Sequence, residues 1–294
     1  MIMKHNYLNN RDILKEIHKS KLTYCSFLTP EDGYYDIILP SIEKINKKNT
    51  TEGKKLRAAR LGRAAYEAAQ SKTTDKLKLD DFAIKPSKIP ETDVVFRVMT
   101  WEHIPYDTGK KKKAELVLDD EEVVTEYDDE DSPKQLKYIK INFPPFQHFK
   151  IDTNGVPYLV GKSHWQGDLG TGVFCKTHGQ MTNKLAHMFM KLCERYATRS
   201  NWRGYTYNDE MRSTALLQLS QIGLQFDESK SENPFAYYTA AITNSFTRVL
   251  NIEKRNQNMR DDILEMNGLT PSYTRQGLSS WGGGNTNNGE YIDD

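Results

Sequence analysis

Three stretches in the C-terminal third of the chain carry apolar residues at helical spacing. The first covers 185–198. The second begins at Asn208, a good N-cap followed by two acidic residues, and runs to Gly223. The third begins at Asn233-Pro234, a cap followed by proline at the first helical position. The apolar positions expected to face the core of this helical bundle are Leu185, Phe189, Leu192, Cys193, Tyr196, Met211, Ala215, Leu219, Ile222, Tyr238, Ile242, Phe246 and Val249.

Between residues 94 and 160 the hydrophobic period changes to two, which is typical of strands. The sequence Asp152-Thr153-Asn154-Gly155 has the composition of a hairpin turn. We therefore predict a small antiparallel β module placed before the helical bundle. Its alternating segments are Val94–Trp101, Glu115–Val124, Tyr138–Phe143 and Val156–Val160.

The N-terminal part reads as mixed structure. A short helix is expected over 9–19, capped by Asn10, then a strand within 22–29 and a turn at 30–33. A strong helix is predicted over 52–72. This helix is basic, which permits a contact with DNA or an acidic surface, although a solvated face is the commoner use of such charge runs. Its cationic residues are Lys54, Lys55, Arg57, Arg60 and Arg63.

These patterns together predict an α+β chain with a C-terminal helical bundle, an inserted small antiparallel β module and a basic helix. Glycine, asparagine and serine are frequent near the C-terminus, so we expect a flexible tail there. The expected segments are an N-terminal helix in 1–20, a mixed segment 21–93 containing the basic helix 52–72, the β module 94–160, a Gly-rich connector 161–182, the bundle 183–262 and the tail 263–294.

Charge and cysteine content limit the possible functions. The chain has 41 Lys and Arg against 40 Asp and Glu, a formal net charge of +1, which argues against autonomous, non-specific DNA binding. It permits a protein that meets DNA only within a larger complex. Three scattered cysteines, no apolar run of membrane-spanning length and no secretory segment lead us to expect a soluble, intracellular protein.

The sequence shows no evident catalytic site. No Ser-His-Asp or Cys-His set and no carboxylate pair has a usable spacing, and the glycines of 167–172 fit neither nucleotide-binding pattern. A zinc site formed by Cys175, His178, His187 and Cys193 would lack the usual paired-ligand spacing, and Cys193 is better explained as a buried thiol. We expect no enzyme activity, no cofactor and no metal site.

A second face of the third C-terminal helix carries a different kind of chemistry. Tyr237, Ala241, Asn244 and Arg248 follow one another at spacings of four, three and four. An aromatic ring can stack on unpaired bases, an amide can read base edges, and a guanidinium can hold phosphate. This face is therefore a candidate nucleic-acid interface.

The same region resembles a known family. It is similar to the late-transcription sigma factors of T-even bacteriophages and, over 210–248, to the promoter-melting domain of sigma-70 factors; the phage resemblance also covers part of 1–20, with Asn6-Tyr7, Asn9-Asn10 and Asp12-Ile13-Leu14. The intervening residues have no counterpart in it. The matching residues are Asn201, Gly204-Tyr205-Thr206, Glu210-Met211, Gly223-Leu224, Phe226-Asp227-Glu228, Lys230, Asn233-Pro234, Ala236-Tyr237 and Thr239, and sigma-70 factors share Ile222, Phe226, Tyr237, Thr239, Ile242, Thr247 and Arg248.

The resemblance implies two binding surfaces. The helix before the connector would bind the clamp helices of the largest RNA polymerase subunit through Asp209, Glu210, Ser213, Leu216, Leu217 and Ser220. Alternatively, Leu216 and Leu217 only complete a helix core. The next helix would bind promoter DNA through Phe235, Tyr237, Ala241, Asn244, Thr247, Arg248, Lys254 and Arg255. At Ala240-Ala241 this chain departs from bacterial factors, which carry two tryptophans that wedge the duplex open.

The C-terminal tail offers one more candidate partner. Phage late factors lack a helix-turn-helix for a −35 element and dock on the replication sliding clamp through an apolar and acidic tail, which Gly289–Asp294, with Tyr291 and Ile292, resembles weakly. A disordered end without a partner explains this tail equally well. The resemblance thus predicts a phage-encoded sigma-like initiation factor in the host cytoplasm, which would bind host polymerase core and recognise and open an A·T-rich −10-type late promoter. The alternatives are a phage structural or assembly protein and a polymerase-binding inhibitor.

Overall fold

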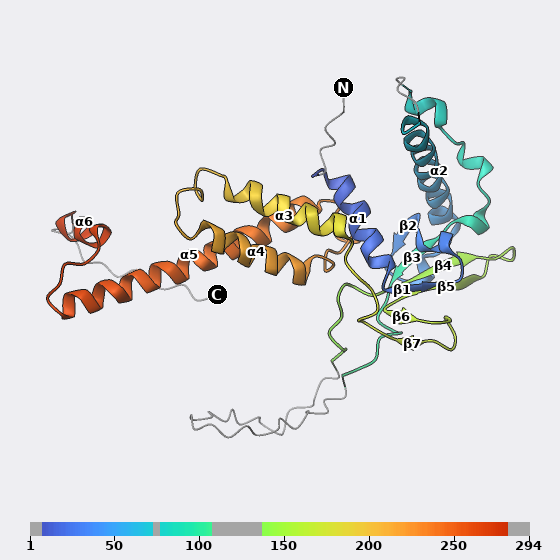
Figure 1. Cartoon of the computed structure of the whole chain (residues 1–294). Coiled ribbons are helices and arrows are strands. Elements are labelled where there is room, and N and C mark those ends of the chain that lie inside the picture. Colours follow the sequence, from blue (N-terminus) through green and yellow to red (C-terminus); the bar gives the residue numbers. More distant parts are fainter. Residues whose placement is uncertain (1–7, 73–76, 108–136, 282–294) are drawn as a thin grey trace. The chain divides into compact units, whose positions relative to one another are not determined.

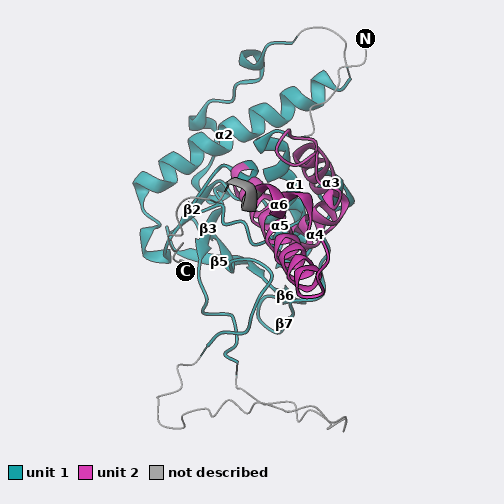
Figure 2. Ribbon diagram, turned by 90° about the vertical axis from the view of Figure 1, so that its left-hand side faces the viewer, with its two compact units in different colours: residues 1–188, 222–235 teal, residues 189–221, 236–294 magenta. Residues whose placement is uncertain are grey.

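The computed structural model describes residues 8–72, 77–107 and 137–281 of the chain (Figure 1). Two compact units share the chain, as Figure 2 shows in two colours. Unit 1 comprises residues 1–188 and 222–235, and unit 2 comprises 189–221 and 236–294. Helices and strands are both present, so the predicted α+β class is confirmed. None of the described helices is both long and apolar enough to cross a membrane.

Unit 1 is built on a five-stranded sheet with strand order β1-β5-β4-β3-β2. The predicted turn at 152–155 joins β4 to β5, with Gly155 at φ +82° and the Asp152 carboxylate accepting from the Asn154 amide. Neighbouring strands are antiparallel except β2 and β3, which are parallel. The strands are β1 (Cys25–Phe27), β2 (Ile37–Leu39), β3 (Phe96–Met99), β4 (Phe146–Ile151) and β5 (Pro157–Ser163).

The sheet corrects the predicted β module in two ways. First, β1 and β2 come from the N-terminal segment, so the sheet is neither confined to 94–160 nor purely antiparallel. Second, of the expected strand Tyr138–Phe143 only one isolated bridge forms, between Tyr138 and Tyr106. Pro144 and Pro145 follow it, and because proline cannot donate to a strand ladder, the ladder begins after them, in β4. The expected strand Glu115–Val124 lies outside the described residues.

One helix packs on the parallel edge of this sheet. Helix α2 (Lys47–Gln70) starts five residues earlier than predicted, because the Asn46 side chain caps it by accepting from the Asn49 amide. Its buried face consists of small residues. A Cβ atom at Gly53 would lie 2.5 Å from a methyl carbon of Val94, so only glycine permits this close approach. The apolar core beneath contains Leu39, Val94, Phe96, Val98, Phe149 and Ile151.

The first helix and the predicted connector complete unit 1. Helix α1 (Asn10–Leu22) is capped by Asn9, whose side chain accepts from the Asp12 amide; Asn10, the predicted cap, is already helical. Within the connector 161–182, strands β6 (Trp165–Gln166) and β7 (Val173–Phe174) form a small hairpin, and Gly167 in its turn has φ +91°. The glycines of 167–172 therefore serve a turn.

Unit 2 contains most of three helices, α3 (Asn183–Ala197), α4 (Asn208–Ile222) and α5 (Pro234–Met266). Aromatic edges join α3 to α5: the ring centroids of Phe189 and Tyr238 lie 4.8 Å apart, and those of Tyr196 and Phe246 lie 5.2 Å apart. The predicted core positions of all three helices are buried, except Ile222, which is half-buried. Asn208, the predicted N-cap, instead begins α4, and its amide donates to the carbonyls of Ala197 and Trp202.

The predicted flexible tail is wrong for its first part. Helix α5 continues to Met266, and after Gly268, at φ +69°, the chain forms α6 (Tyr273–Trp281). The buried carboxylate of Asp261 accepts from both the amide and the hydroxyl of Ser272, at 2.8 and 2.7 Å, and so ties the start of α6 to α5. Tyr291 and Ile292, the candidate clamp contacts, lie outside the described residues.

Candidate functional site

The predicted nucleic-acid face lies on α5, beside the buried stripe of the same helix. Asn244, Thr247 and Arg248 are exposed, whereas the core positions one residue or two away are buried. Helix α5 is long and continuous (Figure 1), so it carries the face onward to two further cations. The candidate residues exposed to solvent are Phe235, Asn244, Thr247, Arg248, Lys254 and Arg255, and those half-buried are Tyr237 and Ala241.

Tyr237 is half-buried, unlike the exposed residues of the same face. Its ring packs edge-on against Tyr238, with centroids 5.3 Å apart and an interplanar angle of 72°. Partial burial raises the pKa of the Tyr237 phenol, so the side chain is neutral at physiological pH. A half-buried ring with a fixed orientation loses little conformational entropy when a base stacks on it. Beside it, Ala240 is exposed but has no side chain that could act as a wedge.

The predicted polymerase-binding surface lies on α4. Asp209, Glu210, Ser213, Leu217 and Ser220 are exposed, and Leu216 is half-buried. With 61 % of Leu217 exposed, this residue does not complete the helix core within the described structure, which leaves an apolar side chain among acids and hydroxyls. The hydroxyls of Ser213 and Ser220 donate to carbonyls of their own helix, those of Asp209 and Leu217. The face therefore combines two carboxylates with one exposed leucine.

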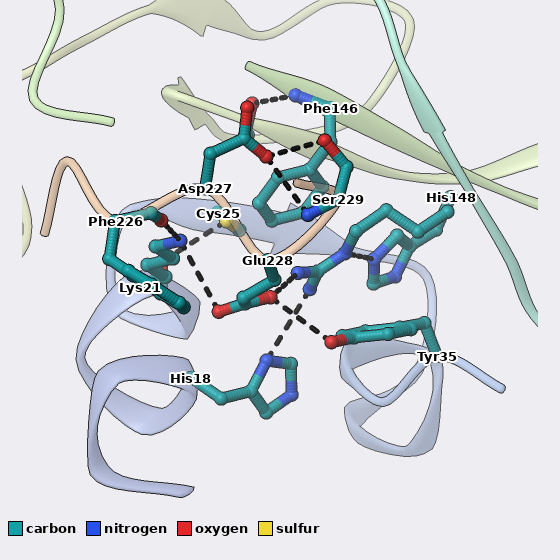
Figure 3. A network of polar contacts seen from close by, with 12 residues as sticks. His18, Lys21, Cys25, Tyr35, Phe146, His148, Phe226, Asp227, Glu228 and Ser229 are labelled. Carbon is teal, nitrogen blue, oxygen red and sulfur yellow. Dashed lines mark hydrogen bonds and ion pairs between the residues drawn. The ribbon is translucent and has the colours of Figure 1, made fainter. Parts of the chain in front are cut away.

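The connector between α4 and α5 belongs to unit 1, and buried charges fix it to the rest of that unit (Figure 3). Glu228, on this connector, accepts from three groups: Arg97 at 2.6 Å, Tyr35 at 3.1 Å and Lys21 at 3.2 Å. The Lys21 ammonium also donates to the Phe226 carbonyl at 2.7 Å. Because each ionised group here has an opposite charge or an acceptor within hydrogen-bond distance, the network offsets the cost of burying it.

Arg97 is the centre of this network. It is only 1 % exposed, and its guanidinium carbon lies 3.8 Å from the ring centroids of both Tyr35 and Phe146. Its Nε donates to Nε2 of His148 at 3.0 Å, so that nitrogen is unprotonated, and Nδ1 of His148 lies 2.6 Å from the Asp32 carbonyl, to which it donates. Burial, and then the charge of Arg97, lowers the pKa of His148 well below its ordinary value.

Glu228 and His18, which both lie beside Arg97, titrate far below neutral pH. Burial opposes the ionisation of Glu228, but the charges of Lys21 and Arg97 outweigh it and lower the pKa of Glu228 to about 2. Burial and the charge of Arg97 lower the pKa of His18 to about 3. The network therefore keeps one charge pattern, with Glu228 ionised and His18 neutral, across the physiological pH range.

The network also joins helix α1 to the connector between α4 and α5. Lys21 lies near the end of α1, beyond the matching residues of the N-terminal stretch, and it binds Phe226 and Glu228. At the other end of α1, the side-chain oxygen of Asn10 accepts from the Phe235 amide at 3.0 Å. The sequence singled out Phe226-Asp227-Glu228 only as matching residues. No local signal announces that Arg97, 131 residues away, is the partner of Glu228.

Two cations of the basic helix α2 form ion pairs within the fold. Arg57 and Arg60 bind the fully buried carboxylate of Asp36 at 3.2 and 2.6 Å, and Lys54 lies 3.8 Å from Glu91. Lys55 and Arg63 are exposed on the remainder of the helix. For Arg57 and Arg60 the contacts favour a structural role over a DNA contact.

The described cysteines and histidines form no metal-binding cluster. Among the described residues no three His, Cys, Asp or Glu side chains are placed to hold a metal ion. Cys193 is buried, which raises the pKa of its thiol to about 11. Nδ1 of His178 lies 3.0 Å from the Cys175 carbonyl, a local contact within the loop after β7.

Comparison with known proteins adds nothing to this description, because no family model, no curated protein and no solved structure matches the chain.

Proposed function

We propose that this protein is a sigma-like transcription initiation factor. It would bind the core of a bacterial RNA polymerase in the host cytoplasm and recognise an A·T-rich −10-type promoter of phage late genes. The proposal rests on the resemblance over 1–20 and 185–255. The observation that carries it furthest is the division of α5 into a buried apolar stripe and an exposed face with Asn244, Thr247 and Arg248.

Each group on the α5 face has a chemical role in this proposal. The Asn244 amide pairs bidentately with an adenine edge, and the Tyr237 ring stacks on the base at the upstream edge of the opened strand. Thr247 adds a hydroxyl beside the amide. Arg248, Lys254 and Arg255 hold phosphates, which positions the duplex without reading its sequence.

The α4 face supplies the second half of the function. Its carboxylates, Asp209 and Glu210, suit a basic partner surface, and the exposed Leu217 supplies an apolar contact of the kind found at the centre of interfaces. Binding through this face would bring α5 to the promoter as part of the polymerase complex. A chain with a net charge of +1 then needs no strong affinity for DNA of its own.

Run-off transcription with host core polymerase on an A·T-rich late-promoter template tests the proposal. We expect promoter-specific transcripts with the wild-type chain, fewer with Asn244→Ala or Tyr237→Ala, and an unchanged yield with Gln70→Ala, an exposed amide on α2. Loss of core binding with Leu217→Glu would assign the α4 face. An absence of any core binding by the wild-type chain would refute the sigma hypothesis.

The exposed Ala240 favours one second candidate, a polymerase-binding inhibitor that uses the same surface without opening DNA. Such a protein would bind core and give no promoter-specific transcripts, even when the phage sliding clamp is added as a possible activator. Transcripts that appear only with the clamp would instead support the initiation factor and give the C-terminal tail a role.

A further inference from the structure

The C-terminal half of α5 carries an exposed apolar stripe. Ile252 is 46 % exposed, Met259 50 %, Ile263 59 % and Met266 86 %. At about 100° per residue, these four side chains and Asn256 fall within an arc of about 80° on the helix. Scattered single apolar residues on a surface need no explanation, but a continuous stripe along several turns does.

The described contacts between α6 and α5 leave this stripe uncovered. Helix α6 and the preceding Ser272 contact α5 through Gln257, Asp261, Asp262 and Glu265, at 2.6 to 3.1 Å. Gln257 and Asp261 lie about 140–180° around the helix from Ile252, on the opposite side. A short helical extension that buries no apolar face is only marginally stable in water. The stripe thus has the form of a contact surface.

The spacing of the stripe is that of a coiled-coil seam. Taking Ile252 as position d of a heptad, Asn256 is a, Met259 d, Ile263 a and Met266 d. Val249, the preceding a position, is only 4 % exposed and belongs to the core of unit 2. The seam therefore begins where the buried stripe of α5 ends.

The charges beside the seam favour one orientation of a second, identical helix. The flanking e positions are Glu253 and Arg260, and the flanking g positions are Arg255 and Asp262. In an antiparallel pair centred between residues 257 and 258, e faces e and g faces g. Glu253 then meets Arg260 of the partner subunit, twice, whereas Asp262 already binds Arg275 of its own chain at 2.6 Å. A parallel pair would instead place Arg255 against Arg260 of the partner subunit, twice.

We propose that a second copy of this chain covers the stripe from Ile252 to Ile263, forming an antiparallel two-stranded coiled coil over 252–263. Ile252 packs against Ile263 of the partner subunit, and Met259 packs beside Asn256 of the partner subunit. Two heptads bury little area, so the dimer is weak, with a dissociation constant on the order of 10 μM. The pairing needs neither DNA nor polymerase, so it is tested separately from the proposed function, although Arg255 flanks the seam and is also a proposed phosphate contact.

Sedimentation velocity of the full chain over a range of concentrations tests the dimer. We expect a shift from monomer to dimer that is weakened at least about tenfold by Ile263→Glu, because that variant buries two carboxylates in the seam. Val156→Glu replaces an equally exposed apolar residue in unit 1 and serves as the matched control, with unchanged dimerisation. A wild-type chain that remains monomeric at concentrations far above the expected dissociation constant overturns the proposal.

A charge exchange tests the orientation. Glu253→Arg and Arg260→Glu should each weaken the dimer, since each creates two like-charge contacts, and the double variant should restore it. In a parallel pair Arg260→Glu alone would strengthen association, because the introduced carboxylate would meet Arg255 of the partner subunit. That result, or a double variant as weak as the singles, overturns the antiparallel arrangement. Far-ultraviolet circular dichroism confirms that each variant retains its helices.

Discussion

The connector around Glu228 and the outer face of α5 both consist of polar and charged side chains, yet their physical situations are opposite. Glu228 is buried, and each of its contacts comes from a residue far away in sequence. Asn244, Thr247 and Arg248 are exposed on one helix. Buried charges need partners in fixed positions, whereas exposed polar groups remain available to a ligand. The first region therefore suits holding the fold together, and the second suits recognition.

Replacing the buried acid gives the largest effect on stability. Glu228→Gln should lower the free energy of unfolding by about 3–5 kcal/mol, because it leaves Lys21 and Arg97 buried without a counter-charge. Chemical denaturation followed by tryptophan fluorescence measures the change. The exposed Glu232, on the same connector, is the matched control, and Glu232→Gln should cost less than about 0.5 kcal/mol. Equal effects of the two variants would contradict the structural role assigned to the buried Glu228.

Acid should destabilise unit 1 before it destabilises unit 2. All seven histidines lie within residues 1–188, hence in unit 1. Burial is the first cause that lowers the pKa of His18 and His164 to about 3 and that of His103 to about 4, from an ordinary value of 6.5. Between pH 6.5 and these values the unfolded chain binds protons that the folded chain does not. Stability therefore falls as the pH falls, by about 1.4 kcal/mol per pH unit for each such histidine.

Protonation of Glu228 causes a second loss of stability at lower pH. Its folded-state pKa of about 2 lies below the ordinary 4.5, so its contribution is present above pH 4.5 and is lost as the pH falls towards 2. Hydrogen exchange at about pH 4–5, where the histidine effect is already large, should show the amides of β3 and β4 losing protection before those of α5. Simultaneous loss in both units would contradict this order.

Changes on the α5 face should affect function and leave stability nearly unchanged. Asn244→Ala removes an exposed amide, so we expect a change in unfolding free energy below about 0.5 kcal/mol. If the amide reads adenine, the same variant loses about 1–3 kcal/mol of discrimination, which corresponds to roughly a 5- to 150-fold fall in promoter-specific transcription. A fall in stability that matches the fall in transcription would refute the recognition role.

The smallest effect is expected for the proposed phosphate contacts. Lys254→Ala and Arg255→Ala should each weaken template binding to a similar degree on every sequence and reduce the slope of log affinity against log salt by about 1. Competition assays at several salt concentrations, with the polymerase complex, measure the slope. Arg63→Ala, which removes an exposed cation of α2, should leave it unchanged; a change there would give the basic helix the role that the sequence left open.

The two regions also differ in how well they follow from sequence. The core stripe of α5, from Tyr238 to Val249, was predictable because helical periodicity is local. A strand was expected within 22–29, where β1 forms, but its pairing with β5 was not. Strand β2 has three residues, too few for alternation to show, and it joins the sheet only through its partner β3. Helix α6 depends on the contact of Ser272 with Asp261, and a tail rich in glycine and asparagine gave no sign of it.

The pairing of Arg97 with Glu228 has a consequence for folding during synthesis of the chain. During synthesis Arg97 emerges 131 residues before its counter-charge. At roughly 5–20 residues per second, the ribosome takes about 7–26 seconds to cover that distance. For this interval the nascent chain has an uncompensated cation at the place where its sheet closes. Unit 1 therefore reaches its final form only after α3 and α4 have been translated.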